Sequence, residues 1–246
     1  MGVLKLHTGP IHCVAVTEGY VVTGGEDGFV RVWPLDFSDY LMEAHHESPV
    51  SALSVSEDGL RLLVGAKAGT VGVLDVCTHE YLTLMRSHAG GIVALAHDPS
   101  DERTEFATAS NADRTIRVWD RLTGAQRYEF ASPDDGCSCL SYHPLAHVLA
   151  AGFESGVLRV FDVKGTSTLY EFQQHNGTLL QVLHSPNGAA LFSASSDGHV
   201  CVHDALNAYQ VRVLTYLRRR CGVVCRRCRC APPTGRPLSP PTSPPE

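Results

Sequence analysis

Short runs of apolar or alternating residues, separated by turns that contain Gly and Asp, make up most of this chain. The first group comprises Ile11–Val16, Tyr20–Gly24 and Phe29–Trp33, followed by a more polar run near Asp39–Glu43. Runs of this length, bounded by turn residues and lacking a helical period, are typical of β-strands. The pattern therefore predicts an all-β protein.

The group of four runs recurs at a nearly constant interval. The position that closes the third run is occupied by Trp33, Leu74, Trp119, Phe161 and His203, and the successive steps are 41, 45, 42 and 42 residues. A period of about 40–45 residues ending in a Trp-Asp-like pair is the signature of WD40 propeller blades. The sequence thus resembles the WD40 repeat family, which implies a β-propeller of about five four-stranded blades. The expected blades span residues 7–43, 46–85, 88–130, 134–172 and 175–214.

The character of the chain changes after the fifth repeat. Residues 1–214 are expected to form the propeller, and residues 215–246, rich in Arg, Cys and Pro, to form a disordered tail. A closed five-bladed ring is possible, because propellers of about 4–8 blades exist. We favour an open array that is a piece of a longer one, since Val3–Leu6 has the character of an outer strand of a preceding blade. Such an array exposes an apolar blade face at each end.

Resemblance to the WD40 family also implies a buried hydrogen-bonded set in each blade. Its members are a His before the first strand, a Ser or Thr in the second, an Asp in the next turn and a Trp ending the third. A buried Asp needs hydrogen-bond donors, which an imidazole and a hydroxyl group can relay. Matched by position, the set is His7, Thr23, Asp27 and Trp33 in repeat one, His88, Thr108, Asp113 and Trp119 in repeat three, and His175, Ser193 and Asp197 in repeat five.

Three repeats depart from this set. In repeat five, His203 stands where Trp is expected, and in repeats two and four the same position is Leu74 and Phe161. The Asp position is Ala68 in repeat two and Ser155 in repeat four, which also lacks the leading His. We expect two intact blades, one partly intact blade and two degenerate ones.

A more specific resemblance rests on sequence outside the generic repeat. The stretches Gly25–Ser38, Leu41–Pro49 and Tyr128–Phe130 are similar to the C-terminal WD-repeat region of the WD repeat-containing protein 90 family of large centriolar proteins. That resemblance implies a scaffold that binds centriolar or microtubule-associated proteins through its propeller loops and supports cilium assembly. It also implies a cytoplasmic protein at the centriole, centrosome or cilium base.

Charge argues against a nucleic-acid partner. Residues 1–217 hold 13 Lys and Arg against 25 Asp and Glu, a net charge of −12, whereas residues 218–246 hold seven Arg and one Glu. Phosphate contacts need clustered cations, which the body lacks. No apolar run reaches the roughly 18 residues of a membrane span, and no Gly-rich phosphate loop or nucleophile elbow occurs. The sequence therefore predicts neither membrane association, nor a cofactor, nor an enzyme.

Metal binding is not expected either. The His residues of the blade set have structural roles, and the other His residues have no common spacing. Four cysteines, Cys221, Cys225, Cys228 and Cys230, crowd into the tail. Their spacing does not form the paired knuckles that converge on zinc.

Two other functions stay open. Substrate receptors of cullin-type ubiquitin ligases carry a third-strand pattern of Trp-Asp, one spacer and then Arg or Lys. Trp119 and Asp120 match it, but Arg121 follows Asp120 without the spacer, so the match is a near miss in which Arg121 would contact the adaptor. The negative charge of the body also fits a propeller that binds basic peptides in an acidic central pore. In each case the function is protein binding.

Overall fold

The computed structural model describes residues 6–100 and 103–216, and the regular structure in that part of the chain consists of β-strands. Twenty strands form five four-stranded sheets, here called blades one to five. Blade one contains β1 (Ile11–Val16), β2 (Tyr20–Gly25), β3 (Phe29–Pro34) and β4 (Met42–His45); blade two β5 (Val50–Val55), β6 (Arg61–Ala66), β7 (Thr70–Asp75) and β8 (Tyr81–Arg86); blade three β9 (Ile92–His97), β10 (Glu105–Ser110), β11 (Thr115–Asp120) and β12 (Gln126–Ala131); blade four β13 (Cys137–Tyr142), β14 (Val148–Phe153), β15 (Val157–Asp162) and β16 (Ser167–Gln173); and blade five β17 (Leu179–His184), β18 (Ala190–Ser195), β19 (His199–Asp204) and β20 (Gln210–Tyr216).

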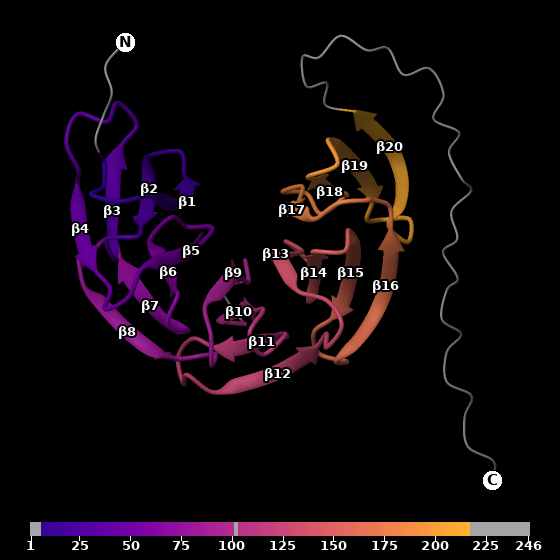
Figure 1. Cartoon of the computed structure of the whole chain (residues 1–246), viewed down its shortest axis with the longest axis horizontal. Helices are drawn as coiled ribbons and strands as arrows, with labels where there is room; N and C mark the ends of the chain where they lie inside the picture. The colour runs from indigo at the N-terminus through magenta and orange to yellow at the C-terminus, as the bar shows by residue number, and fades with distance from the viewer. Residues whose placement is uncertain (1–5, 101–102, 217–246) are drawn as a thin grey trace.

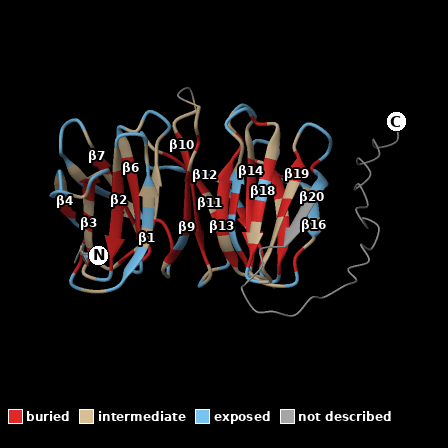
Figure 2. Cartoon of the chain, turned by 90° about the horizontal axis from the view of Figure 1, so that it is seen from above, coloured by how far each residue is buried: buried red, intermediate tan, exposed pale blue. Residues whose placement is uncertain are grey.

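Within each blade the four strands are antiparallel and follow one another in chain order. Figure 1 shows the blades around an arc, with the first strand of each blade on the inside and the fourth on the outside. In the side view of Figure 2, the strands stand upright and the connecting turns lie on two opposite faces. The predicted all-β propeller architecture is confirmed.

The arc is open between blade one and blade five (Figure 1). The first strands of successive blades, β1, β5, β9, β13 and β17, contact their neighbours in that order. The closed ring of five blades is therefore not formed, and the open array is the arrangement found. The predictions for the tail, including its four cysteines, lie outside the described residues.

The first blade also corrects one predicted strand. The fourth strand, expected near Asp39–Glu43, is Met42–His45 instead. The preceding residues form turns, because the Asp36 carboxylate accepts the Ser38 N–H at 3.0 Å and the Asp39 carboxylate accepts the Tyr40 N–H at 2.9 Å. Local side-chain bonds of this kind compete with a sheet ladder.

The apolar core is divided among the four blade interfaces. One cluster joins blades one and two around Val22 and Leu62, and the next joins blades two and three around Leu63 and Phe106. Equivalent clusters fill the two later interfaces. Each blade thus buries its sheet faces against its neighbours, as stacked repeats do. No helix in the described part of the chain has the length and apolar character that a membrane crossing requires.

Candidate functional site

The described part of the chain contains three clusters of polar groups that bear on function: the buried side-chain set of each blade, the central channel, and an ionic cluster between blades three and four. The buried sets hold the loops that precede the blades. In blade one, Thr23 on β2 is the centre of the set. Its Oγ1 lies 2.8 Å from Nε2 of His7 and 2.8 Å from Nε1 of Trp33, and His7 Nδ1 lies 2.8 Å from Asp27 Oδ1.

Blade three repeats this geometry. Thr108 Oγ1 lies 2.8 Å from His88 Nε2 and 2.9 Å from Trp119 Nε1, and His88 Nδ1 lies 2.9 Å from Asp113 Oδ2. Burial lowers the pKa of His88, against the opposing effect of Asp113, so the imidazole is neutral in the fold. Although burial opposes ionisation of Asp113, its hydrogen bond with His88 helps to hold the pKa of that carboxyl below its usual value.

Blade five keeps the His and Ser but ends differently. Ser193 Oγ lies 2.9 Å from His175 Nε2 and 3.2 Å from Nε2 of His203, which occupies the Trp position. His203 Nδ1 lies 3.3 Å from the carbonyl oxygen of Tyr209. His175 Nδ1 is 3.4 Å from Asp197 Oδ2 and makes no hydrogen bond. The structure therefore brings all four side chains together but leaves the His–Asp hydrogen bond unmade.

Blade two completes its set with Tyr81, a residue that the sequence did not single out. Its leading His46 bonds through Nε2 to Thr70 Oγ1 at 2.6 Å, and through Nδ1 to the Tyr81 hydroxyl. The Tyr81 ring crosses to this place over Gly72, where a Cβ atom would lie 2.1 Å from the hydroxyl oxygen. Tyr81 thus supplies the partner that Asp provides in blades one and three. Gly72 stands where blades one and three have Arg31 and Arg117. This glycine is the sequence feature that could have indicated room for the Tyr81 ring.

Blade four builds its equivalent from an arginine. Arg159 on β15 donates from Nη1 to Ser132 Oγ at 2.7 Å, and its guanidinium carbon lies 4.6 Å from the centre of the Phe153 ring. Ser132 precedes the blade, one residue before Pro133, which stands at the place where the other blades have His. A cation over an aromatic ring is itself stabilising, so this degenerate repeat has a polar connection of its own.

The first strands of all five blades line a central cavity of about 600 Å³. Its polar lining includes His12, His97 and His184, and among the described residues that line it Glu57 is the one acidic side chain. The prediction of an acidic pore is wrong for this part of the channel. The described first strands hold no Asp or Glu; the acidic residues of the body lie in turns and on second, third and fourth strands, as Glu105, Asp120 and Glu129 do.

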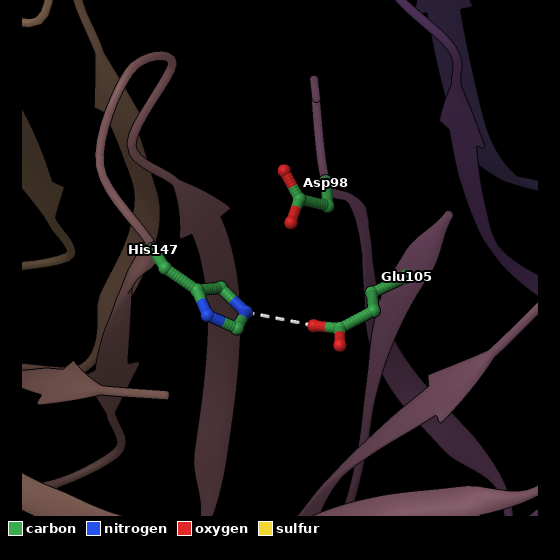
Figure 3. Close-up of side chains that lie close together, drawn as sticks. All are labelled: Asp98, Glu105 and His147. Carbon is green, nitrogen blue, oxygen red and sulfur yellow. Dashed lines mark hydrogen bonds and ion pairs between the residues drawn. The ribbon is translucent and has the colours of Figure 1, made fainter. Parts of the chain in front are cut away.

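An ionic cluster joins blades three and four (Figure 3). His147 Nε2 lies 2.7 Å from Glu105 Oε2, and Asp98 completes a group whose donor atoms lie within 4.8 Å of one another. Asp98 also accepts two bonds from Arg103, at 2.6 and 3.0 Å, and Glu105 accepts one from Arg127 at 3.2 Å. Because both carboxylates already have cationic partners, the cluster acts as an inter-blade ion-pair network.

Arg121 follows directly after β11, in the turn that leads to β12. Its backbone N–H donates to the Thr104 carbonyl oxygen at 2.8 Å, and its side chain is half-buried. The preceding Asp120 accepts the Leu122 N–H at 2.8 Å and pairs with Arg127. This turn is thus rigidly held, with Leu122 projecting into solvent.

Comparison with known proteins gives two family matches. The model described as "WDR90/POC16, second beta-propeller" matches residues 96–235, and the one described as "WD domain, G-beta repeat" matches residues 1–34. Both matches are to propeller repeats.

Three relatives are similar over most of the chain. WD repeat-containing protein 90 is 39% identical over 78% of the chain in Xenopus tropicalis and 40% identical over 76% in Homo sapiens. Centriole proteome protein 16 of Chlamydomonas reinhardtii is 47% identical over 84% of the chain. The matched region covers 10%, 11% and 10% of these relatives, so the chain spans about a tenth of their length.

Proposed function

The chain belongs to the WDR90/POC16 second β-propeller family, and on that premise we propose that it is a non-catalytic scaffold that binds proteins at the centriole and supports cilium assembly. The observation that supports this most is the 47% identity to a relative named as a centriole protein, over 84% of the chain. The centriolar location rests on the name of one relative, which is about ten times longer, and the role in cilium assembly rests on the family resemblance of the sequence.

The geometry supports rigid display of loops. In blades one and three the buried set ties the loop that precedes the blade to its second strand and to the turn that follows it, as His88 is tied to Thr108 and Asp113. Loops held on a rigid framework are the usual place for binding residues. The chemistry of the described polar clusters is also accounted for by hydrogen bonds and ion pairs within the fold, which favours binding over catalysis.

Localisation of the tagged full chain in ciliated cells tests the proposal. We expect a focus that coincides with a centriole marker, and fewer ciliated cells after depletion of the transcript, restored by a resistant copy. A diffuse signal for a chain that is folded by circular dichroism would overturn the centriolar assignment.

Arg121→Ala serves as the matched variant in the same experiment. It alters a half-buried side chain that belongs to no buried set, so the scaffold proposal expects centriolar location to be unchanged. Co-purification of a cullin adaptor with the wild-type chain, lost in Arg121→Ala, would instead support the ubiquitin-ligase receptor.

A further inference from the structure

The ionic cluster between blades three and four is bordered by a buried hydroxyl group that has no hydrogen-bond partner in the chain. It belongs to Tyr142, the last residue of β13, which is 6% exposed. Burial, followed by the negative charges of Asp98 and Glu105, raises the pKa of Tyr142 well above its usual value. The hydroxyl group therefore lies near both carboxylates but bonds to neither. A buried polar group of this kind needs an explanation, and a bound water molecule or ion supplies one.

Three side chains of the kinds that ligate metals converge beside this hydroxyl group (Figure 3). Asp98 follows β9 and Glu105 begins β10, both in blade three, whereas His147 lies in the turn between β13 and β14 of blade four. One donor atom of each lies within 4.8 Å of the others. Two ligands of one transition-metal ion, each at about 2.0–2.2 Å, lie at most about 4.4 Å apart. A contraction of about half an ångström would therefore let the three side chains share one ion.

The arginine partners of the two carboxylates do not exclude an ion. Arg103 donates to both oxygens of Asp98, and Arg127 donates to one oxygen of Glu105. An ionised carboxylate has about four lone-pair sites, so acceptor sites remain on both residues. Carboxylates that ligate metals are themselves commonly held by hydrogen bonds from other side chains. The two arginines thus orient the carboxylates.

The balance of charge also favours a cation. Asp120 pairs with Arg127, so the groups joined by these contacts are three carboxylates and two guanidinium groups. The imidazole that ligates a metal is the neutral form. Surplus charge in a buried site is costly unless it is compensated. A divalent cation would compensate the surplus negative charge of the cluster.

A small cavity borders the two carboxylates. Its volume is about 30 Å³, and its lining residues include Asp98, Glu105, Ser100 and Thr104. A cavity of this size holds one water molecule. An ion with three protein ligands commonly takes a water molecule as well, so the surroundings of the cluster provide room for that ligand.

We propose that this cluster binds one divalent transition-metal ion through Asp98, Glu105 and His147, and that the ion joins blade three to blade four. The Tyr142 hydroxyl group supplies a fourth oxygen. An imidazole with oxygen donors suits Zn²⁺, and the carboxylates also suit Mn²⁺. The ligands span residues 98–147 without a regular spacing, so they form a site only because the fold brings two blades together. The site depends on this blade interface alone and holds for any location of the protein in the cell.

Titration of the full chain with Mn²⁺, followed by electron paramagnetic resonance, tests the proposal. Mn²⁺ is the probe because it prefers oxygen donors to thiolates, which keeps it away from the cysteines of the chain. The signal of aqueous Mn²⁺ falls when the ion is bound, so the titration counts bound ions. We expect one Mn²⁺ per chain. At about 100 times its dissociation constant, free Mn²⁺ should raise the unfolding temperature by about 5–10 °C.

Tyr142→Phe is the decisive variant. It removes only a hydroxyl group that has no partner in the chain, so the stability of the metal-free chain should be unchanged or higher. The dissociation constant for Mn²⁺ should nevertheless rise at least ~10-fold. His147→Gln can still donate to Glu105 from its amide, but it lacks the imidazole ligand and should raise the dissociation constant at least ~100-fold.

His79→Gln, at an exposed histidine in the turn between β7 and β8, is the matched control and should bind Mn²⁺ as the wild type does. Circular dichroism checks that all variants are folded. A wild-type chain that binds no Mn²⁺, an unchanged dissociation constant in Tyr142→Phe or in His147→Gln, or an equal loss in His79→Gln overturns the proposal.

Discussion

Blades three and five hold the same kind of buried side-chain set, yet they close it with different residues. In blade three the closing residue is Trp119, whose indole N–H can only donate, and it does so to Thr108 at 2.9 Å. In blade five it is His203, which is fully buried. A neutral imidazole donates with one nitrogen and accepts with the other. The direction of the whole set therefore depends on this one position.

A count of protons shows the consequence. The contacts of blade three are Trp119–Thr108, Thr108–His88 and His88–Asp113, and indole, hydroxyl and imidazole supply one proton for each. Blade five adds a contact, because His203 also faces the Tyr209 carbonyl oxygen. Four contacts then share three protons, and the contact left without a hydrogen bond is the one between His175 and Asp197, at 3.4 Å.

Because of this difference, we expect the two blades to respond differently to substitution within their buried sets. Every polar atom of the blade-three set depends on the others, so the loss of one leaves buried groups unpaired, which is costly. In blade five one contact is already missing. Loss of the central hydroxyl there removes hydrogen bonds, but it also frees the His175 proton for Asp197.

Removing the central hydroxyl should give the largest difference between the blades. Thr108→Val leaves the indole N–H of Trp119 and Nε2 of His88 unpaired in a buried site, and we expect a loss of about 3 kcal/mol in the free energy of unfolding. Ser193→Ala frees His175 to donate to Asp197, so the loss there should be about 1 kcal/mol. Urea denaturation measures both. Equal losses would show that the proton count does not matter.

The dependence of stability on pH should separate the blades by a smaller amount. Burial, partly offset by the bond to Tyr209, lowers the pKa of His203 from 6.5 to about 4. The unfolded chain then binds a proton below pH 6.5 that the folded chain binds only near pH 4. Stability from this group is complete above pH 6.5 and is lost as the pH falls toward 4.

His203→Trp removes that dependence. Between pH 7 and pH 4.5 the variant should lose about 2 kcal/mol less than the wild type. His97 and His184, whose pKa values are both lowered to about 3 mainly by burial, titrate in both proteins and cancel in the difference. A steeper pH dependence in the variant would mean that His203 carries a second proton in the folded chain. That result would contradict the expected neutral His203.

The sequence predicted the all-β blades well, because strand length, turn residues and the repeat interval are local properties. Gly59 and Gly188 lie in first hairpins with φ of 68° and 69°, a conformation that favours glycine. What could not be predicted was compensation between strands. Tyr81 serves blade two from an outer strand, since Gly72 leaves room for its ring, and this depends on cross-strand register.

The turn between the second and third strands of a blade should give the smallest effect. At this turn blade three, not blade five, has the less favourable residue. This turn needs a positive φ in every blade: Gly198 has a φ of 83° in blade five, whereas Arg114 has a φ of 52° in blade three. A non-glycine residue in that region is strained by about 1 kcal/mol. Arg114→Gly should therefore stabilise the chain by up to about 1 kcal/mol, less what the bond from the Arg114 side chain to the Pro133 carbonyl oxygen contributes.

Gly69→Ala at the matching place in blade two should destabilise the chain, because the new Cβ would lie 2.3 Å from the His88 carbonyl oxygen. Thermal unfolding of both variants measures the pair, and a destabilised Arg114→Gly would mean that blade three depends on the arginine contact more than it suffers from the strained backbone.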